Sequence, residues 1–375
     1  MKRRDDTIGI YVHIPFCVRK CAYCDFLSFN ADADMHNAYV NSLCKQIDAA
    51  GDNRPVASVY IGGGTPSSID SKRIVEILCK LKERFVILPE AEITIEANPG
   101  TVTRESLKTY KDAGINRLSI GLQSSDDNEL KLLGRIHSFS DFILAYNTAR
   151  EVGFDNINVD IMTALPNQNA DILNSTLDKV LSLKPEHVSA YSLIIEEGTP
   201  FYERYGENGV MGVEDERALF YLCRDRLKNA GYEHYEISNF SIPGYFSRHN
   251  TSYWTRRDYY GFGLGASSLI NGHRIKNETD IEKYINNPQL ICEDIALSPE
   301  DEMEEYMFLG LRMLKGVSIR EFNELFDADY KTLYGKITDK LVSDGLLKND
   351  GDIICLTEKG LDYGNYVFSS FLLEN

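Results

Sequence analysis

Residues 13–26 read HIPFCVRKCAYCDF, and this stretch decides both the fold and the chemistry of the chain. It places Cys17, Cys21 and Cys24 on one short loop with the spacing C-x3-C-x2-C. Three thiolates on a single loop can converge on one metal centre. Because three ligands leave a four-position centre one ligand short, a substrate could bind at the open position. The pattern therefore predicts a cysteine-held metal centre with an open site.

The other cysteines are scattered singly, at Cys44, Cys79, Cys223, Cys292 and Cys355. They form no disulfide framework and no second cluster motif, so we expect each to be a small buried apolar side chain. The first residues, MKRRDDTIGIYVHI, carry two acids and too short an apolar run for a signal peptide, and no later stretch is apolar enough to span a bilayer. We therefore expect a cytoplasmic protein with reduced thiols.

Composition indicates a large folded chain whose main partner is not nucleic acid. With 375 residues, 43% of them hydrophobic, the chain can bury a sizeable core and form two or three domains. Its formal net charge is −17, whereas binding to nucleic acid phosphates depends on a surplus of Lys and Arg. A polyanionic ligand would therefore need a local basic pocket.

The first half alternates short β-rich runs with amphipathic segments of helical length, a pattern typical of successive βα units. We expect strands near residues 9–13, 58–62, 92–97, 117–121, 156–162 and 188–193. We expect helices near residues 37–50, 71–85, 104–113, 139–152 and 170–183. Six such units predict an α/β fold with a parallel sheet, most simply a curled, incomplete barrel.

Distinctive residues follow these strands at the points where the strands end. The cysteine loop follows the first strand, and the sequences GGGTP (62–66), EANPG (96–100) and GLQS (121–124) follow the next three, while Asp160 lies in the fifth. Since the carboxyl ends of parallel strands meet on one face, these residues should converge on a common site. The glycines would let backbone amides approach a charged ligand closely, and Thr65 could add a hydroxyl.

Simpler explanations exist for each motif. The thiols could hold a structural zinc ion with His13 as the fourth ligand, and the glycines could be only a tight turn. Salt bridges or capping could account for Glu96, Gln123, Arg135 and Asp160 one at a time. Together, however, these four supply carboxylates for hydroxyls or an ammonium group, an amide, and a guanidinium for a carboxylate. That is the set that a zwitterionic nucleoside requires, and we favour an iron-sulfur cluster over zinc.

With Tyr23 just before the last cysteine and GGGTP downstream, the chain resembles the radical S-adenosylmethionine superfamily. The runs HIPFC, EANPG, LSIGLQS, LGRIHS and YEISNF resemble the oxygen-independent coproporphyrinogen III oxidase family within it. The resemblance implies an incomplete (β/α)6 radical SAM barrel, a 4Fe-4S cluster on the three cysteines, and S-adenosyl-L-methionine on the open iron. It implies that the S-adenosylmethionine site is lined by Tyr11, Tyr23, Gly63, Gly64, Thr65, Glu96, Gln123, Arg135, Asp160 and Ile194.

Two features separate this chain from the true oxidases. Those enzymes carry a further cysteine two positions beyond the third, where this chain has Phe26, and a long N-terminal extension, whereas about ten residues precede the first expected strand here. Downstream, residues 248–254 read RHNTSYW, and the HNxxYW pattern resembles the haem chaperone HemW branch of the family. Some members of that branch have a cysteine near position 247, where this chain has Ser247.

This branch implies a protein that binds haem and passes it to haem-accepting apoproteins. His249 would be an axial ligand of the haem iron, with Tyr253 and Trp254 as flat surfaces beside the macrocycle. Without the resemblance, His249 would be a histidine hydrogen-bonded to its neighbours, with the aromatic residues packed in a core. The alternative function is an oxidase that decarboxylates coproporphyrinogen III through a 5'-deoxyadenosyl radical. The sequence assigns no catalytic residue, and it is compatible with a homodimer and with peripheral membrane contact.

We expect three domains: a radical SAM core barrel over residues 1–235, a mixed α+β extension with the haem site over 236–297, and a winged-helix-like domain over 298–375. In the last, helices are expected at 304–314, 319–326 and 330–344, followed by a wing at 346–356 and a final helix. Residues 318–375 contain six Lys or Arg against eleven Asp or Glu, which opposes DNA binding. Packing against the barrel or docking a protein is expected instead.

Overall fold

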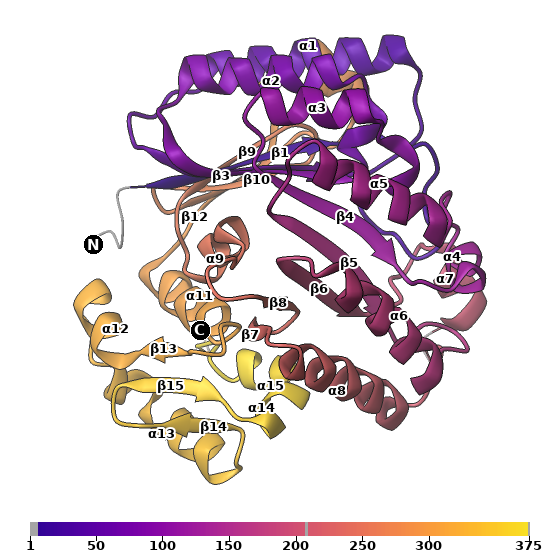
Figure 1. Cartoon of the computed structure of the whole chain (residues 1–375). Coiled ribbons are helices and arrows are strands. Elements are labelled where there is room, and N and C mark those ends of the chain that lie inside the picture. The colour runs from indigo at the N-terminus through magenta and orange to yellow at the C-terminus, as the bar shows by residue number, and fades with distance from the viewer. Residues whose placement is uncertain (1–6, 207–208, 374–375) are drawn as a thin grey trace.

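The computed structural model describes residues 7–206 and 209–373. Within these residues, twelve strands form one curved sheet in the order β12-β11-β10-β9-β1-β2-β3-β4-β5-β6-β8-β7 (Figure 1). Its centre consists of six parallel strands in chain order, which confirms the predicted α/β barrel architecture. These are β1 (Ile8–Ile14), β2 (Val56–Gly63), β3 (Ile87–Ala97), β4 (Arg117–Gln123), β5 (Ile157–Thr163) and β6 (His187–Ser192).

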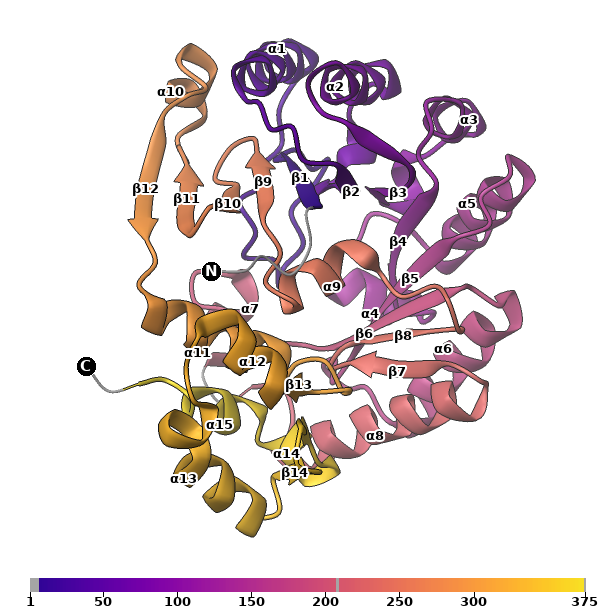
Figure 2. The ribbon, with the colours of Figure 1, turned by 90° about the vertical axis from the view of Figure 1, so that its left-hand side faces the viewer.

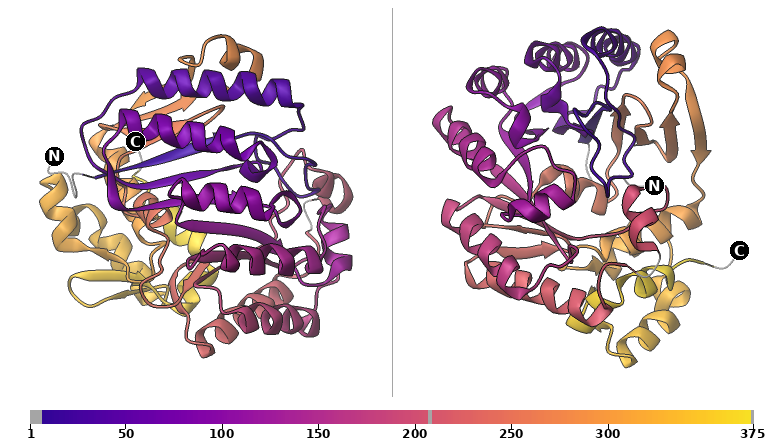
Figure 3. Two further views of the ribbon diagram at one scale, coloured as in Figure 1. Left: turned by 45° about the horizontal axis from the view of Figure 1, so that its top comes forward. Right: turned by 90° about the vertical axis from the view of Figure 1, so that its right-hand side faces the viewer.

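Helices cover the outer face of this sheet (Figures 2 and 3). They are α1 (Ala33–Ala49), α2 (Ser71–Arg84), α3 (Arg104–Asp112), α4 (Asp127–Leu132), α5 (Phe139–Glu151), α6 (Ala170–Leu183) and α8 (Val213–Asn229). In α2, Ile74, Ile77, Leu78 and Leu81 are buried, and this three-to-four spacing forms one apolar stripe. Each such side chain contributes about 1.5–3 kcal/mol when it leaves water. The amphipathic pattern therefore sets which face packs on the strands.

Side-chain caps fix where these helices begin. Thr103 and Ser138 form capping boxes at α3 and α5, and Asp70 and Asn169 accept backbone hydrogen bonds at α2 and α6. The six predicted strands and five predicted barrel helices are all present, with ends shifted by a few residues. The short helix α4 was not predicted, because six residues are too few to show a helical repeat.

The second half of the chain extends the sheet at both edges. On one side β9 (Tyr259–Phe262) pairs in parallel with β1, and β10 (Ser267–Ile270), β11 (His273–Asn277) and β12 (Ile291–Ala296) continue antiparallel. On the other side β8 (Asn239–Ser241) and β7 (Glu233–Glu236) continue from β6. Helix α9 (Arg248–Trp254) lies inside the curve of the sheet (Figure 2). Helices α7 (Pro200–Tyr205) and α10 (Ile281–Asn286) are short connections.

The C-terminal part has a core of its own. It contains α11 (Pro299–Gly310), β13 (Val317–Ser318), α12 (Ile319–Phe326), α13 (Tyr330–Ser343), β14 (Leu347–Asn349) and β15 (Ile353–Leu356). The predicted first helix begins five residues earlier than expected, since Ser298 caps it with Pro299 in its first turn. The expected final helix is instead two short helices, α14 (Glu358–Asp362) and α15 (Gly364–Ser369), which meet at Tyr363. Three antiparallel strands and these helices give the predicted winged-helix-like arrangement.

Two expectations about the chain as a whole can be compared with the structure. Cys44 and Cys223 are buried as expected, but Cys79 and Cys292 are exposed, so burial of all the single cysteines was a wrong prediction. Cys79 lies on the solvent side of α2, and every residue of β12, including Cys292, is exposed at the sheet edge. None of the helices in the described residues combines the length and apolar character that crossing a bilayer requires.

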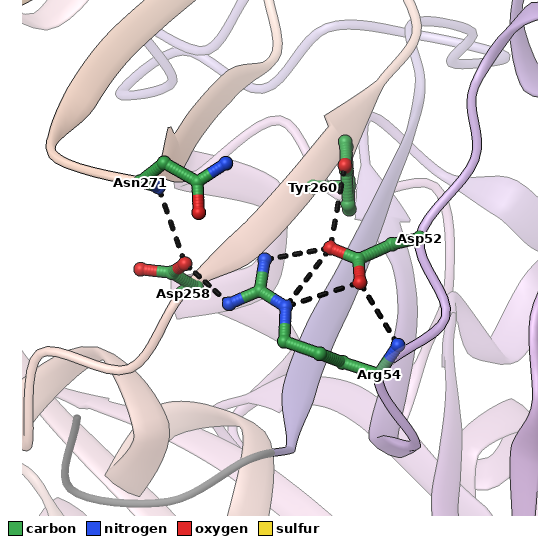
Figure 4. Close-up of polar contacts among 5 residues, drawn as sticks. All are labelled: Asp52, Arg54, Asp258, Tyr260 and Asn271. Carbon is green, nitrogen blue, oxygen red and sulfur yellow. Dashed lines mark hydrogen bonds and ion pairs between the residues drawn. The ribbon is translucent and has the colours of Figure 1, made fainter.

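An ion-pair network fastens β9 to the loop before β2 (Figure 4). The Arg54 guanidinium lies 2.6 Å from an Asp52 oxygen and 2.5 Å from an Asp258 oxygen. Asp52 also accepts a hydrogen bond from the Tyr260 hydroxyl, and Asp258 accepts one from the backbone amide of Asn271. The network holds the extension against the first barrel strands, where β1 meets β9.

We expect Arg54→Ala to lower the free energy of unfolding by about 2–3 kcal/mol, because two largely buried carboxylates lose a charged hydrogen-bond donor. The control is Arg104→Ala, since Arg104 pairs with Glu151 on the open surface, where such a pair contributes about 0.5 kcal/mol or less. Urea unfolding of both variants measures the difference. If both variants lost the same free energy of unfolding, the network would not stabilise the contact between β9 and the loop before β2.

Candidate functional site

The barrel encloses a cavity of about 350 Å³ that begins at the cysteine loop and runs between the strands. Its walls come from the cysteine loop, the glycine loop after β2, the inward face of β3 to β6, and Asn250 of α9. Strand ends that are far apart in sequence thus meet at one place, as the sequence predicts. Of the residues expected around S-adenosylmethionine, the cavity is lined by Tyr23, Gly63, Gly64, Thr65, Glu96, Gln123, Arg135 and Asp160.

The cysteine loop is held by backbone hydrogen bonds that leave the thiols facing the cavity. Cys17 donates its amide to the Phe29 carbonyl at 2.9 Å, and the amide of Cys24 bonds to the Cys21 carbonyl at 3.3 Å. All three thiols line the cavity and are free of disulfides. The Cys17 sulfur lies 3.5 Å from the Thr65 hydroxyl, and Arg135 Nη1 donates to the Cys21 sulfur at 3.5 Å. A hydroxyl and a guanidinium thus lie beside two of the three sulfurs.

Both ring nitrogens of His13 are hydrogen-bonded to groups other than the cysteines. Its Nε2 lies 2.9 Å from the Leu27 carbonyl oxygen, and its Nδ1 lies 2.9 Å from the Tyr11 hydroxyl. Both ring nitrogens are therefore occupied, and in this structure His13 cannot serve as the fourth ligand of a zinc site with the three cysteines.

The amides of the glycine loop hold the loop against neighbouring parts of the protein. The Gly63 amide donates to Glu96 at 3.0 Å, the Gly64 amide to the Ile14 carbonyl at 2.9 Å, and the Thr65 amide to the Phe16 carbonyl at 2.7 Å. In this structure the three amides bind the protein itself, and a role of the loop in ligand binding stays a prediction. Glycine is needed for close approach: a Cβ on Gly64 would lie 2.7 Å from the Phe16 oxygen. The loop thus fixes the cysteine loop against β2.

Two partly buried carboxylates, those of Glu96 and Asp160, form the polar centre of the cavity. Glu96 accepts hydrogen bonds from the Tyr60 hydroxyl at 2.6 Å and from Gly63, while Asp160 accepts one from Asn158 Nδ2 at 2.7 Å. Burial raises the pKa of Glu96 to about 7, against the hydrogen bonds that lower it. Burial likewise raises the pKa of Asp160. Each carboxyl group can therefore keep a proton more readily than in water, or accept a hydrogen bond from a ligand.

Two guanidinium groups line the same cavity, and each has an Nε donor without a hydrogen-bond partner among the described residues. Arg117 is 2% exposed and lines the cavity, and its Nε finds no hydrogen-bond partner among the described residues. Arg135 donates to the Gly121 carbonyl at 2.8 Å and to Cys21, and its Nε is likewise unpaired within the described chain. Buried polar atoms are almost always hydrogen-bonded, so these orphan donors indicate a cavity built for a polar ligand.

Several lining residues were missed at the sequence level, although a signal for them exists. Along β4, Arg117, Ser119, Gly121 and Gln123 all line the cavity, and they are alternate residues. Since side chains alternate between the two faces of a strand, polar residues at every second position of a buried strand mark an inward polar face. The other missed residues are Arg19, Lys20, Phe26, Tyr60, Ala97, Asn98, Asn158, Met162, Ser189, Tyr191 and Asn250.

Comparison with known proteins matches this geometry. Residues 11–180 match the family model of the radical SAM superfamily, and residues 297–363 match that of the HemN C-terminal domain. The protein named heme chaperone HemW from Lactococcus lactis is 37% identical over 97% of this chain and 97% of its own length. The chain belongs to the HemW family. The HemW proteins of Bacillus subtilis and Escherichia coli are 35% and 33% identical, each over at least 97% of both chains.

A solved structure confirms the fold. Coproporphyrinogen III oxidase (HemN) from Escherichia coli superposes with a TM-score of 0.85 over 98% of this chain and 90% of its own, at 22% identity. At that identity the likeness concerns the fold alone. Membership of the radical SAM superfamily implies S-adenosylmethionine and a 4Fe-4S cluster, and the residues present fit both groups: three thiols with favourable neighbours, orphan guanidinium donors and two buried carboxylates.

Two residues expected at the S-adenosylmethionine site are not among those lining the cavity. Tyr11 hydrogen-bonds His13 and stacks on Tyr60 with ring centroids 6.3 Å apart. Ile194 follows β6, and its side chain is 68% exposed. In this HemW family member, Tyr11 supports the cavity wall from behind Tyr60, and Ile194 lies at the surface.

The HNxxYW segment forms α9, and its histidine is buried. His249 is 1% exposed, with Nδ1 3.0 Å from the Ser58 hydroxyl and Nε2 2.8 Å from the Tyr253 hydroxyl. Its ring stacks on Tyr60 at 5.1 Å, and burial lowers the pKa of His249 to about 3. The Arg312 guanidinium lies over Trp254, 4.3 Å from the ring centroid. In this conformation His249 is a neutral core histidine with both nitrogens occupied.

The raised pKa of Glu96 makes stability depend on pH. Between pH 4.5 and about 7 the folded chain keeps a proton on Glu96 that the unfolded chain has lost, so stability falls as pH rises through this window. We expect Glu96→Gln to reduce the difference in unfolding free energy between pH 5 and pH 8 by about 2–3 kcal/mol. Urea unfolding of the cluster-free chain measures it, with the exposed Glu105→Gln as control. If the stability of Glu96→Gln depended on pH as in the parent chain, Glu96 would not be the group responsible.

Proposed function

We propose that this chain binds haem and passes it to acceptor proteins, as the names of its relatives describe for them. The observation that carries the proposal is similarity to heme chaperone HemW proteins over nearly the full length of both chains. The RHNTSYW segment supports it, because α9 reaches the cavity through Asn250. We also propose a cytoplasmic location and a homodimer, and the three predicted domains (1–235, 236–297, 298–375) as working boundaries.

We propose that Cys17, Cys21 and Cys24 hold a 4Fe-4S cluster and that S-adenosylmethionine occupies the cavity beside it. When bound, these groups would supply one-electron chemistry, and the protein would position them. Arg135, next to the Cys21 sulfur, stabilises thiolate charge, and the carboxylates of Glu96 and Asp160 accept hydrogen bonds from ligand hydroxyls or an ammonium group. Thr65 and Gln123 add a hydroxyl and an amide at the same wall.

For haem, we propose His249 as iron ligand, with Tyr253 and Trp254 beside the macrocycle. Coordination requires His249 to give up its hydrogen bond to Ser58 or to Tyr253. Its low pKa keeps the imidazole neutral, the form that binds iron. Haem binding therefore includes a rearrangement around α9.

We expect His249→Ala to weaken haem binding and to shift the Soret band of the complex, because the proposed axial ligand is lost. Anaerobic haem titration followed by visible spectroscopy measures both, and His273→Ala, an exposed histidine paired with Asp294, is the control. An unchanged spectrum in His249→Ala would remove His249 as the ligand. Consumption of coproporphyrinogen III by the cluster-loaded protein would instead support an oxidase.

A further inference from the structure

The end of the barrel cavity that is remote from the cysteines contains a buried cation. Arg117 begins β4 and Gln123 ends it, and both residues line the cavity. Because a strand rises about 3.3 Å per residue, their backbones lie roughly 20 Å apart along β4. Arg135 belongs to the cysteine end, since it contacts both the Cys21 sulfur and the Gly121 carbonyl. Arg117 therefore begins at the opposite end, which we call the deep end of the cavity.

The Arg117 side chain has no counter-ion in contact with it. It is buried, and its guanidinium forms neither a hydrogen bond nor an ion pair with any of the residues that the structure describes. The two carboxylates of the cavity have other partners: Glu96 accepts a hydrogen bond from Tyr60, and Asp160 accepts one from Asn158. Burying a charge without a partner is costly, so a buried cation that faces a cavity indicates an anionic ligand.

Helix α9, inside the curve of the sheet, adds a second polar group at this end (Figure 2). Asn250 of α9 lines the cavity, and its side-chain amide makes no hydrogen bond within the described chain. The preceding residue, His249, stacks on Tyr60 of the cavity wall. Burial, and after it the charge of Arg117, lower the pKa of His249, which agrees with a guanidinium close to this part of α9. A cation and an amide are thus available to a ligand at the deep end.

The surroundings of Arg117 favour a singly charged carboxylate. A planar guanidinium can donate two parallel hydrogen bonds to a carboxylate. A doubly charged phosphate is less favourable there, because the carboxylates of Glu96 and Asp160 line the same cavity. The rings of Tyr60 and Tyr191 add flat apolar walls. Together these groups match a small acid whose carboxylate is attached to a flat apolar body.

We propose that the deep end of the cavity binds the carboxylate of a small apolar acid, with Arg117 as its counter-ion and Asn250 as a hydrogen-bond donor. The proposal rests on the assignment of the cysteine end to the cluster and S-adenosylmethionine, which makes the acid a second ligand of the same cavity. With Arg135 at one end and Arg117 at the other, the cavity has a separate cation for each ligand.

Benzoate and benzamide test the site, because the two molecules have similar shapes and only benzoate is charged. In calorimetric titrations of the full-length, anaerobically reconstituted chain, benzoate should bind at least about tenfold more tightly, since loss of a charged hydrogen bond weakens binding by that factor. Arg117→Met keeps most of the side-chain length and should remove this preference, whereas Arg117→Lys should recover part of it. Arg104→Met, on the exposed surface of α3, is the control.

Asn250→Asp provides a second test that does not depend on folding of Arg117→Met. The aspartate has the same shape, breaks no side-chain hydrogen bond within the described chain, and places another carboxylate in the cavity. It should weaken benzoate severalfold and leave benzamide unchanged. Equal affinities for benzoate and benzamide in the parent chain would overturn the site, as would equal effects of Arg117→Met and Arg104→Met. Arg117-dependent binding of inorganic phosphate that is tighter than binding of benzoate would overturn the assignment to a carboxylate.

Adding S-adenosylmethionine to the same titrations separates this proposal from the cofactor assignment. Benzoate affinity that is retained in its presence supports two ligands in one cavity. Competition between the two would overturn the proposal, because Arg117 would then belong to the S-adenosylmethionine site. If S-adenosylmethionine does not bind and benzoate binds in an Arg117-dependent manner, the cofactor assignment fails and the acid site stands. If neither ligand binds, both proposals fail.

Discussion

Replacing Cys21 with serine is expected to abolish assembly of the iron-sulfur cluster. A hydroxyl is a poor substitute for a thiolate, and in the proposed cluster each of the three cysteines would supply one of three protein ligands. Iron and sulfide content after anaerobic reconstitution should fall from about four of each per chain to near zero, and Cys17→Ser and Cys24→Ser should behave alike.

The control is Cys79→Ser, because Cys79 is an exposed thiol on α2 away from the cavity. It should retain the full iron and sulfide content. Four irons retained in Cys21→Ser, or zinc without sulfide in the parent chain, would refute the cluster assignment.

Gly63→Ala is expected to destabilise the barrel strongly. Gly63 has a φ of +112°, and a Cβ there would lie 2.4 Å from Nδ1 of His13. The left-handed backbone and the clash together should cost about 2–4 kcal/mol. The His13 ring cannot move away without losing its bonds to Tyr11 and Leu27. Urea unfolding measures the loss.

Gly335→Ala is the matched control, because Gly335 is helical and its Cβ would meet only the flexible Lys331 side chain. There alanine should stabilise by up to about 1 kcal/mol. A tolerated Gly63→Ala would mean that the loop can relax, and the contact with the cysteine loop would then not be rigid.

The barrel and much of the site could be predicted because both follow from local patterns. Each buried strand is a short apolar run, each helix shows a stripe such as Ile74 to Leu81, and parallel order brings the strand ends together. Glu96, Gln123, Arg135 and Asp160 line one cavity for that reason.

The features that could not be predicted depend on contacts between residues distant in sequence. Nothing near Tyr259 indicates that it pairs with Gly9 of β1. The glycine amides bind Glu96 and the carbonyls before the cysteines, a use that a glycine count cannot distinguish from ligand binding. Likewise, the motif around His249 resembles a ligand site, whereas the fold places the imidazole between Ser58 and Tyr253.

Helix α9 carries His249 and also forms part of the cavity wall through Asn250. If haem binds at His249 as proposed, a shift of this seven-residue helix that favours haem would also change the free energy of binding in the cavity. Such coupling would be reciprocal: if loading the cavity tightened haem binding tenfold, haem would tighten binding in the cavity by the same factor. A haem carrier of this kind would take up or release haem differently with its cofactor bound than without it.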